Sequence, residues 1–321
     1  MKVLIDKHIP FIKGILESYA EVTYLAEEEF SAARVANADA LIIRTTIRCD
    51  ASLLEGSRVR FIATATIGTD HIDMAYCRNH AIQVVSCPGC NAPAVCDYVE
   101  EALRDWCTRG HAVRTLGVVG VGHVGELVAA MAEKKGIEVL VNDAPKGLDL
   151  PLEQLATRCD AITFHVPLTR DGEYPTYHMA DAQFLRHCRP NTLIINAARG
   201  GVVCEQALLE SGLPYVVDCW ENEPRINPDM VTSESAFLVS YHIAGYSVNG
   251  KKKASEMCID AFLSFFGIET CQNGKKYVPL QVELQNTQYG DSKKGWLRRV
   301  SEQLKARPED FTSLRKQYKL R

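Results

Sequence analysis

Short apolar runs, each followed by an amphipathic stretch, organise the first 85 residues of the chain. The runs are rich in Val, Ile and Leu, and polar or turn-forming residues bound them. Alternation of strand-like and helix-like segments is typical of a parallel sheet covered by helices. We therefore predict a small flavodoxin-like α/β domain with strands at residues 3–5, 21–24, 40–43, 61–63 and 82–85.

A stretch rich in Cys, Pro and Gly at residues 86–93 interrupts this pattern, and a second α/β series follows it. Its strands are expected at residues 115–119, 139–141, 161–164, 192–196, 215–217 and 237–239. Helices are expected at residues 94–109, 126–135 and 251–266. If the last helix returns to the first domain, that domain is discontinuous, with hinges near 88–93 and 245–250.

A glycine-rich turn opens the second series, with the sequence Gly120-Val121-Gly122-His123-Val124-Gly125 between a strand-like run and a helix-like stretch. Gly120 permits the tight turn, Gly122 lets a pyrophosphate approach the backbone, and Gly125 lets the helix pack on the strand. The phosphates would face the helix N-terminus, where N–H groups and the dipole favour negative charge. A glycine-rich turn in another kind of α/β protein is the alternative, and the flanking strand and helix disfavour it.

Asp143 ends the next strand-like run, 18 residues after Gly125. A carboxylate there can accept hydrogen bonds from both ribose hydroxyls of NAD and would repel the 2′-phosphate of NADP. Lys146 nearby weakens that discrimination. The motif and this acid predict a Rossmann domain with NAD as the cofactor.

The predicted architecture is therefore α/β, with two domains and an appendage. A substrate-binding, flavodoxin-like domain would comprise residues 1–90 and 251–266, and the NAD-binding Rossmann domain residues 91–250. After Gly267 the apolar fraction falls and the pattern no longer specifies helices or strands, so residues 267–321 form a separate C-terminal segment.

The composition is that of an ordinary globular protein, with 46% hydrophobic and 24% charged residues in 321. The chain shows no signal-peptide core, and no run approaches the ~18 apolar residues of a membrane span. We therefore expect a cytoplasmic protein without a membrane partner. The net charge of −4 is uneven, because residues 293–321 hold ten Lys or Arg against three Asp or Glu. A basic tail can bind nucleic acid, but this one has no reader motif, and a solvated helical face or an arm toward an anionic substrate explains it equally.

Twelve cysteines scatter along the chain without regular spacing, which indicates reduced thiols rather than a disulfide framework. Cys87-Pro88-Gly89-Cys90 has the spacing of redox and half-zinc motifs. No second pair with ligand spacing follows, and Pro-Gly marks a turn. We interpret this segment as a structural crossover and predict no metal.

Three side chains suited to chemistry follow strand ends of the second series: Arg199, Glu223 and His242. Ligands of open α/β sheets bind at the carboxyl ends of the strands, so the three could converge. Arg199 can hold a carboxylate bidentately, and Gly200-Gly201 would let the backbone crowd a ligand. Histidine exchanges protons near neutrality, and Glu223 could hold the imidazole and favour its protonated form. Singly, each has a structural explanation: a surface charge, a Glu-Pro turn and a structural histidine.

In this order, behind a dinucleotide site, these residues resemble the D-isomer-specific 2-hydroxyacid dehydrogenases. The resemblance lies in Gly120 to Gly125, Asn196-Ala197-Ala198-Arg199-Gly200-Gly201-Val202-Val203, Asp218-Cys219-Trp220-Glu221-Asn222-Glu223-Pro224 and His242-Ile243-Ala244-Gly245-Tyr246. A narrower resemblance is to the branch that oxidises 4-phospho-D-erythronate in pyridoxal 5′-phosphate biosynthesis. It rests on residues 64–73, 88–92 and 171–174 and on Tyr246, and it covers about residues 1–270 densely.

The resemblance implies roles for the matching residues. Arg199 would bind the substrate carboxylate and polarise the C2 oxygen, His242 would accept the C2 hydroxyl proton, and Glu223 would orient and tune His242. Asp218 falls where the family contacts the nicotinamide end. The expected cofactor-binding residues are Gly120, Gly122, His123, Val124, Gly125, Asp143, Val166, Ala197, Ala198, Arg199, Asp218 and Gly245.

The resemblance also implies substrate contacts. Thr45, Thr66 and Tyr246 match substrate-binding positions, and Arg44 and Arg48 on the loop of Thr45 are the expected cations for a substrate phosphate. Thr45-Thr46 replaces the Ser-containing loop of the family but keeps one hydroxyl.

The part of the chain after residue 270 is shorter than the family's C-terminal dimerisation domain, and only residues 311–318 are similar to it. We expect a homodimer in which this tail packs across the partner and brings Arg315 toward the neighbouring site. A solvated basic helix is the alternative.

The predicted reaction is oxidation of 4-phospho-D-erythronate by NAD to 3-hydroxy-2-oxo-4-phosphooxybutanoate. Another D-2-hydroxyacid dehydrogenase, such as a phosphoglycerate dehydrogenase or a glyoxylate/hydroxypyruvate reductase, is a close alternative. An alternative of a different class is a protein of the same fold that senses NAD(H) and recruits partners. Retention of Arg199, Glu223 and His242 together favours an enzyme.

Overall fold

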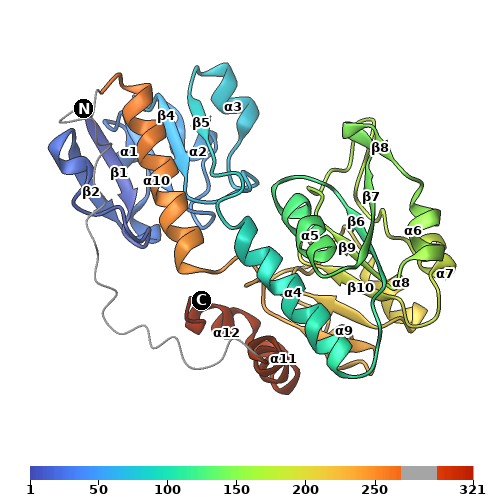
Figure 1. Cartoon of the computed structure of the whole chain (residues 1–321). Helices are drawn as coiled ribbons and strands as arrows, with labels where there is room; N and C mark the ends of the chain where they lie inside the picture. Colours follow the sequence, from blue (N-terminus) through green and yellow to red (C-terminus); the bar gives the residue numbers. More distant parts are fainter. Residues whose placement is uncertain (269–294, 321) are drawn as a thin grey trace. The chain divides into compact units, whose positions relative to one another are not determined.

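The computed structural model describes residues 1–268 and 295–320, and these residues form two compact units. The first unit comprises residues 1–91 and 247–268, and the second comprises residues 92–246 and 295–320. Figure 1 labels their helices and strands. Of the predicted C-terminal segment, residues 269–294 and 321 lie outside the described residues.

The first unit contains a five-stranded parallel sheet in the order β2-β1-β3-β4-β5. Its strands are β1 (Lys2–Asp6), β2 (Glu21–Leu25), β3 (Ala40–Ile43), β4 (Phe61–Thr64) and β5 (Gln83–Val85). Every residue of β3 and β4 is buried. Strands covered on both faces read as continuous apolar runs, which explains why the sequence located them.

Helices cover both faces of this sheet. The short helices α1 (Ala32–Val35), α2 (Ala51–Leu54) and α3 (Met74–Asn79) contribute to the core on one face. The long helix α10 (Val248–Phe265) packs Cys258 and Phe262 against Phe61 on the other face, and Figure 1 shows it in orange beside β4. Single 3-10 turns, η1 (Leu16–Ser18) and η2 (Glu27–Glu29), lie in the connections. The first domain is thus completed by a helix more than 150 residues later in the chain.

The second unit contains a seven-stranded sheet in the order β12-β11-β10-β9-β6-β7-β8. The strands are β6 (Thr115–Val119), β7 (Glu138–Asp143), β8 (Leu148–Asp149), β9 (Ala161–Phe164), β10 (Leu193–Asn196), β11 (Tyr215–Val217) and β12 (Ala236–Val239). All pairs are parallel except β7 with the two-residue β8. Strands β7 and β8 follow β6 on one side of it, and β9 to β12 follow on the other side, so the strand order reverses between β6 and β9. That reversal is where open α/β sheets bind ligands.

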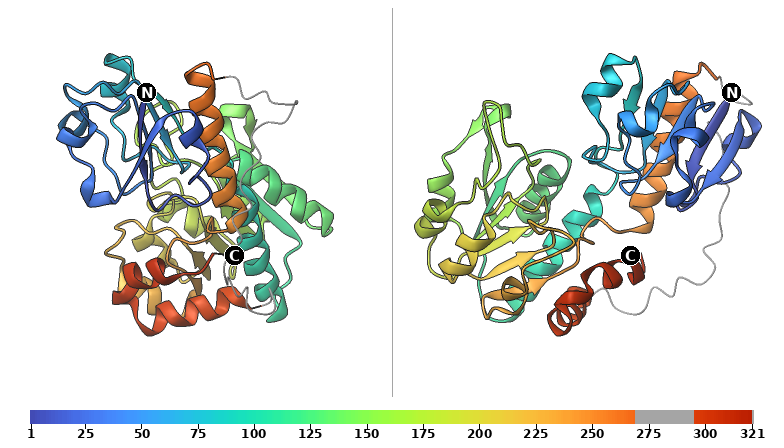
Figure 2. Two further views of the ribbon diagram at one scale, coloured as in Figure 1. Left: turned by 90° about the vertical axis from the view of Figure 1, so that its left-hand side faces the viewer. Right: turned by 180° about the vertical axis from the view of Figure 1, so that it is seen from behind.

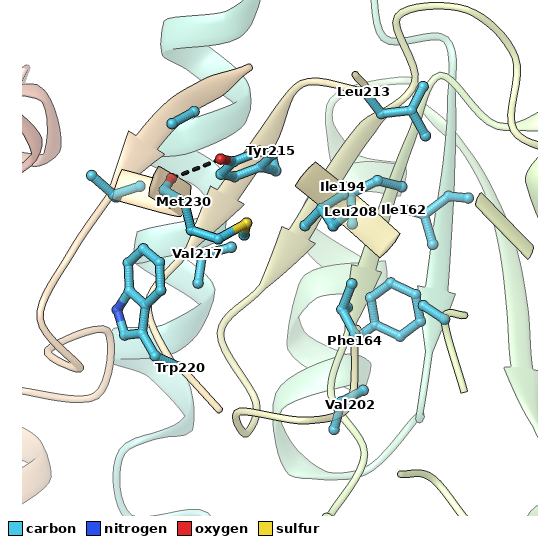
Figure 3. Packing of buried hydrophobic residues seen from close by; sticks show 14 of the residues in the cluster. Ile162, Phe164, Ile194, Val202, Leu208, Leu213, Tyr215, Val217, Trp220 and Met230 are labelled. Atoms are coloured by element: carbon cyan, nitrogen blue, oxygen red, sulfur yellow. Dashed lines mark hydrogen bonds between the residues drawn. The ribbon is translucent and has the colours of Figure 1, made fainter. Parts of the chain in front are cut away.

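Two apolar layers sandwich this sheet. Helices α4 (Ala92–Thr108) and α5 (His123–Lys134) form one layer. The other layer is formed by α6 (Leu152–Arg158), α7 (Ala182–His187), α8 (Glu205–Ser211) and α9 (Pro228–Thr232), with the 3-10 turn η3 (Ala144–Lys146) on the way. Figure 3 shows the second layer, where Phe164 and Trp220 are buried and the Tyr215 hydroxyl donates to the carbonyl of Met230 at 2.7 Å.

The described part of the C-terminal segment packs on the second unit. It forms α11 (Trp296–Ala306), the turn η4 (Pro308–Asp310) and α12 (Phe311–Gln317), drawn in red in Figures 1 and 2. Leu304, Phe311 and Leu314 are buried in the same core as Trp220. The Val239 N–H of β12 donates to Ser301 Oγ at 3.0 Å. Tertiary contacts with its own chain therefore fix this segment.

The predicted α/β class and its two parallel sheets are confirmed, and each predicted strand overlaps an observed one. The helix predicted at residues 126–135 begins earlier, at His123, because Gly122 already serves as its N-cap. Sequence patterns missed β8, α11 and α12. Among the described residues, no helix is both long enough and apolar enough to cross a bilayer.

Candidate functional site

The three glycines of the turn between β6 and α5 face different surroundings. Gly120 has φ +86°, and a Cβ there would lie 2.7 Å from Val166 Cγ1. A Cβ on Gly125 would lie 1.9 Å from the Gly120 carbonyl oxygen, so a side chain is excluded. A Cβ on Gly122 would meet no atom within 4 Å. No side chain caps the N-terminus of α5. Helix N-termini of this kind bind phosphates, and the contact of this turn with a pyrophosphate stays a prediction.

Asp143 ends β7 beside this turn. Its Oδ2 accepts the Val121 N–H at 2.8 Å, which ties the carboxylate to the glycine turn. Lys146 donates to the Val121 carbonyl at 2.5 Å and to Glu126 at 3.0 Å. The charge of Lys146 is thus paired with Glu126. This pairing reduces the ability of Lys146 to neutralise the repulsion between Asp143 and the 2′-phosphate of NADP.

The loop after β10 carries Arg199 and is held by Asn196. The Asn196 amide donates to the Arg199 carbonyl at 3.0 Å, and its Oδ1 accepts the Ala198 N–H at 3.2 Å. Arg199 Nη1 donates to the Ala198 carbonyl at 2.9 Å. Gly200 is required by packing within the protein, a reason that the sequence did not indicate, and the expected close approach of Gly200-Gly201 to a ligand stays a prediction. A Cβ on Gly200 would lie 1.8 Å from the Trp220 carbonyl oxygen, so this glycine packs against the protein itself.

Asp218 organises the loop that carries His242. It is 1% exposed, and its carboxylate accepts Ser240 Oγ at 2.6 Å and the N–H groups of Ile243 and Ala244 at 2.8 and 2.9 Å. The Asp218 carbonyl also accepts the His242 N–H at 2.9 Å. The observed role of Asp218 is therefore to fix the backbone on which His242 stands, while its contact with a nicotinamide stays a prediction.

His242 and Glu223 form a direct pair. His242 Nδ1 lies 2.7 Å from Glu223 Oε2, and the other carboxylate oxygen accepts the Trp220 N–H at 2.9 Å. His242 has φ +58°, a left-handed conformation that is rare for residues other than glycine. Such strain persists only where the surroundings impose it, and here Asp218 holds the adjacent backbone. The geometry is that of an oriented imidazole.

The protonation of this pair follows from its surroundings. Burial alone would raise the pKa of Glu223, but the hydrogen bond and charge of His242, the Trp220 N–H and the charge of Arg315 outweigh it and lower that pKa. An ionised carboxylate only accepts hydrogen bonds. His242 Nδ1 must therefore carry a hydrogen, and Nε2 of the neutral imidazole is left as a proton acceptor.

Two guanidinium groups act on the same buried thiol next to this pair. Burial is the largest cause that raises the pKa of Cys219, followed by the charges of Asp218 and Glu223, while Arg199 and Arg315 lower it. Arg199 and Arg315 therefore both lie within electrostatic reach of Cys219. Arg199, Glu223 and His242 follow the adjacent strands β10, β11 and β12, and His242 and Glu223 are in direct contact.

Arg315 makes a contact within its own chain that the sequence did not predict. Its Nη1 lies 3.7 Å from Glu223 Oε2 of the same chain, and its guanidinium lies 5.6 Å from the ring centre of Tyr246. This contact lies within one chain, and the expected approach of Arg315 to a partner's site stays a prediction. Sequence reasoning missed this contact because nothing in a polar stretch 92 residues beyond Glu223 indicates where it packs.

The remaining predicted cofactor residues lie at the start of α5 and in the loops that follow β9, β10 and β12. His123 and Val124 begin α5, Val166 follows β9 and contacts Gly120, Ala197 is buried after β10, and Gly245 follows the His242 loop.

The predicted substrate residues of the first unit lie around the ends of β3 and β4. Arg44 donates to the fully buried Asp6 at 2.6 Å, so that carboxylate anchors it. Thr45 is exposed, and Arg48 pairs with Asp50 at 2.7 Å while its side chain stays 85% exposed. Thr66 Oγ1 lies 2.7 Å from Thr64 Oγ1. Both guanidinium groups are thus paired with carboxylates, and the contact of these residues with a substrate stays a prediction.

Two clusters within the described ranges bring His, Cys and Glu ligand atoms within 4.8 Å of one another: His178, Cys204 and Glu221, and Cys219, Glu223 and His242. A histidine–glutamate hydrogen bond, of 3.1 Å and 2.7 Å respectively, accounts for the short separation in each. The absence of a metal stays a prediction. Cys87 is buried and Cys90 N–H bonds to its carbonyl at 3.3 Å, the geometry of a turn.

Comparison with known proteins places this site in a family. Residues 100–244 match the NAD binding domain of the D-isomer specific 2-hydroxyacid dehydrogenases. Erythronate-4-phosphate dehydrogenase of Bacteroides fragilis is 43% identical over an alignment of 338 positions that covers 100% of this chain and 97% of the relative. The enzyme of the same name from Shigella dysenteriae is 36% identical, with 90% of this chain and 78% of the relative covered.

The solved structure of NAD⁺-bound 3-phosphoglycerate dehydrogenase from Entamoeba histolytica shares the fold, with a TM-score of 0.70, 23% identity and coverage of 87% of this chain and 99% of that one. The alignment covers nearly the whole Bacteroides relative and about four fifths of the Shigella relative. The chain therefore belongs to the erythronate-4-phosphate dehydrogenase family of D-isomer specific 2-hydroxyacid dehydrogenases.

Proposed function

We propose that the chain oxidises 4-phospho-D-erythronate to 3-hydroxy-2-oxo-4-phosphooxybutanoate with NAD, as a step of pyridoxal 5′-phosphate biosynthesis. The relatives named for this activity support the substrate. The single observation that carries the chemistry is the 2.7 Å contact between His242 Nδ1 and Glu223. It orients an imidazole within the part of the chain that matches an NAD binding domain.

His242 acts as the general base in this proposal. Its Nε2 accepts the proton of the C2 hydroxyl as the C2–O bond becomes a carbonyl, and Glu223 stabilises the imidazolium that forms. A positioned base of this kind contributes roughly 10²–10⁴-fold to the rate. When bound, NAD⁺ would supply the hydride acceptor at nicotinamide C4. C2 would then lose a hydride and its hydroxyl oxygen a proton, which together are a two-electron oxidation of the substrate.

Arg199 recognises the carboxylate and polarises the C2 oxygen. A guanidinium can hold both carboxylate oxygens while a further N–H points at the neighbouring hydroxyl. The Asn196 hydrogen bonds fix the loop and leave this side chain half-buried. Gly120, Gly122 and Gly125, with Asp143, would hold the cofactor.

Residues of the first unit keep, in this proposal, the substrate roles that the family resemblance gives them. Arg44, anchored by Asp6, and the exposed Arg48 are the cations proposed for the phosphate. Thr45 and Thr66 would donate hydroxyl hydrogen bonds, and Tyr246 of the second unit would contact the substrate. In this proposal residues 1–90 and 251–266 form the substrate-binding domain and residues 91–250 the NAD-binding domain.

We also propose that the protein is a cytoplasmic homodimer without a nucleic-acid partner. The similarity of residues 311–318 to the family's dimerisation domain supports the dimer. The contact of Arg315 with Glu223 of its own chain means that the dimer does not need to exchange its tails. Molar mass measured by light scattering during gel filtration tests this point.

A substrate panel tests the function. Purified protein with NAD⁺ is supplied with 4-phosphoerythronate, 3-phosphoglycerate and D-lactate, and NADH formation is followed. We expect the highest kcat/KM for 4-phosphoerythronate. Preference for 3-phosphoglycerate would assign the chain to a phosphoglycerate dehydrogenase, and NADH binding without any turnover would favour a sensor of the same fold.

A further inference from the structure

A cation from the C-terminal helix α12 touches the catalytic pair. Arg315 Nη1 lies 3.7 Å from Glu223 Oε2, the same oxygen that lies 2.7 Å from His242 Nδ1. One carboxylate oxygen is therefore shared by an imidazole and a guanidinium. The proposed reaction uses no residue between 295 and 320, so the contact of Arg315 with Glu223 has no part in it so far.

The surrounding structure holds this contact in place. Phe311 and Leu314 of α12 are 1% and 6% exposed and anchor the helix in the core of the second unit. Arg315 also lies over the ring of Tyr246 and bonds to its side chain, and Tyr318 lies 6.0 Å from Tyr241 between ring centres. The guanidinium is half-buried, with a side-chain exposure of 31%. A fully exposed ion pair contributes little because solvent screens it, whereas the side chains of Arg315 and Glu223 are both partly shielded, with 31% and 20% exposed.

The charge of Arg315 persists at any working pH. Burial would lower its pKa, but Tyr246 and Glu223 outweigh that and raise it. The His242 imidazole and the Arg315 guanidinium converge on the Glu223 carboxylate. The pKa of Glu223 is lowered by His242, by the Trp220 N–H and by Arg315, against the effect of burial. A guanidinium beside Glu223 disfavours a positive charge on the imidazole.

We propose that Arg315 is a positioning residue that holds the Glu223 carboxylate and keeps the His242 imidazole neutral, and hence able to accept a proton, down to a lower pH. Arg315 acts through Glu223 and need not touch the substrate. The inference rests on the proposed function for its catalytic consequence but not for the electrostatics themselves.

Other charged and titratable groups also act electrostatically on the pair of Glu223 and His242. They are Asp218 and Cys219 after β11, Glu205 at the start of α8, Arg199 after β10 and Tyr246 after β12. Each is left unchanged when Arg315 is replaced. A change in the titration of His242 in such a variant therefore reports the loss of one guanidinium.

The test compares Arg315→Gln with Arg315→Lys and with Lys316→Gln. Lys316 is the exposed next residue of α12, so Lys316→Gln removes the same charge from the same helix without touching Glu223. Arg315→Met, which keeps an apolar stem against Tyr246, is the second neutral variant should the glutamine variant fold poorly. Full-length protein is used throughout.

The first readout is the titration of the His242 ring followed by NMR in histidine-labelled protein, with the signal assigned by its loss in His242→Gln. The second is kcat/KM for oxidation as a function of pH. In Arg315→Gln and Arg315→Met we expect the titration midpoint and the acid limb of the pH profile to move up together by about 1 pH unit. Arg315→Lys and Lys316→Gln should remain at the wild-type positions.

Three results would overturn the inference: unchanged midpoints in both neutral variants, an equal shift in Lys316→Gln, or a raised KM with an unmoved acid limb. The last result would make Arg315 a substrate-binding residue instead. Because the NMR titration needs no turnover, a shifted midpoint in a protein that oxidises none of the acids in the panel would refute the proposed function and leave this inference standing.

Discussion

The chemically important side chains of the second unit are held chiefly by backbone groups. Asn196 and Glu223 each bond to main-chain groups two or three residues away, and Asp218 bonds to the N–H groups of Ile243 and Ala244 on another loop. Charge-assisted bonds from N–H groups to carboxylates are among the stronger hydrogen bonds in proteins. The site is therefore organised before any ligand arrives, which is the arrangement expected of a preorganised active site.

His242→Gln tests the general base. The amide keeps the size and a hydrogen bond to Glu223 but cannot take up a proton, so kcat should fall roughly 10²–10⁴-fold while the dissociation constant of NADH stays unchanged. Steady-state kinetics and fluorescence titration of NADH measure the two quantities. If the variant keeps more than half of the wild-type kcat while hydride transfer limits the rate, His242 is not the base.

Asp143→Ala tests cofactor selection. The carboxylate beside the glycine turn should favour NAD over NADP, and its removal should narrow that gap because the 2′-phosphate is no longer repelled. Titration of both cofactors into the wild-type protein and the variant measures the preference. Equal affinities in the wild type would contradict the role given to Asp143.

At this scale the sequence predicted residue identities better than it predicted contacts. Arg199, Glu223 and His242 were recognisable because each follows a strand end in a fixed order. The packing of Gly200 against Trp220 and of Arg315 against Glu223 was not, because both contacts join segments whose meeting depends on the finished tertiary structure.

Among the secondary-structure elements, the turn into α5 separates two uses of glycine. Gly125 has no room for a side chain inside the protein, whereas Gly122 has room for one, and the contact of Gly122 with a bound pyrophosphate is a prediction. Gly125 is thus required for packing, whereas Gly122 is predicted to serve binding.

Gly122→Ala and Gly125→Ala form a matched pair. Gly122→Ala should leave the Tm near that of the wild type and weaken NADH binding about tenfold or more, since one methyl group would displace the pyrophosphate from the N–H groups of α5. Gly125→Ala should lower the Tm because α5 must move away from β6. Thermal unfolding and NADH titration of both variants check this, and a large loss of Tm in Gly122→Ala would contradict the open position of that residue.

The strands were predictable from sequence because those buried on both faces leave continuous apolar runs, as in β3, β4 and β9. β8 consists of two exposed residues and leaves no such signal. α11 buries four residues of an otherwise polar stretch, so its helical character depends on the surface against which it packs.

For the whole molecule, the chain's last described stretch belongs structurally to the NAD-binding unit. Its buried residues Leu297, Leu304 and Phe311 join cores on both sides of the seven-stranded sheet. Arg298 also pairs with Asp105 of α4. The tail that looked like a solvated or exchanged arm in the sequence is an integral layer of its own chain.

Leu304→Ala tests this integration. Leu304 is fully buried, and removal of a buried leucine typically costs roughly 2–5 kcal/mol. Urea unfolding of the full chain should show a loss in that range, while Glu302→Ala on the exposed side of α11 should stay within about 0.5 kcal/mol of the wild type. A loss no larger than that of the control would mean that α11 detaches in solution.

The placement of α11 has a consequence for how copies of the chain meet one another. β12 is an outer strand of its sheet, and an outer strand presents backbone groups with which a strand from another molecule can pair. Ser301 accepts the Val239 N–H, and Lys305 donates to the Ala236 carbonyl. The helix thus occupies with side chains the positions that an incoming strand would need. The segment of α11 and α12 therefore protects the edge of the sheet against pairing with another molecule, and it also carries Arg315, which contacts Glu223.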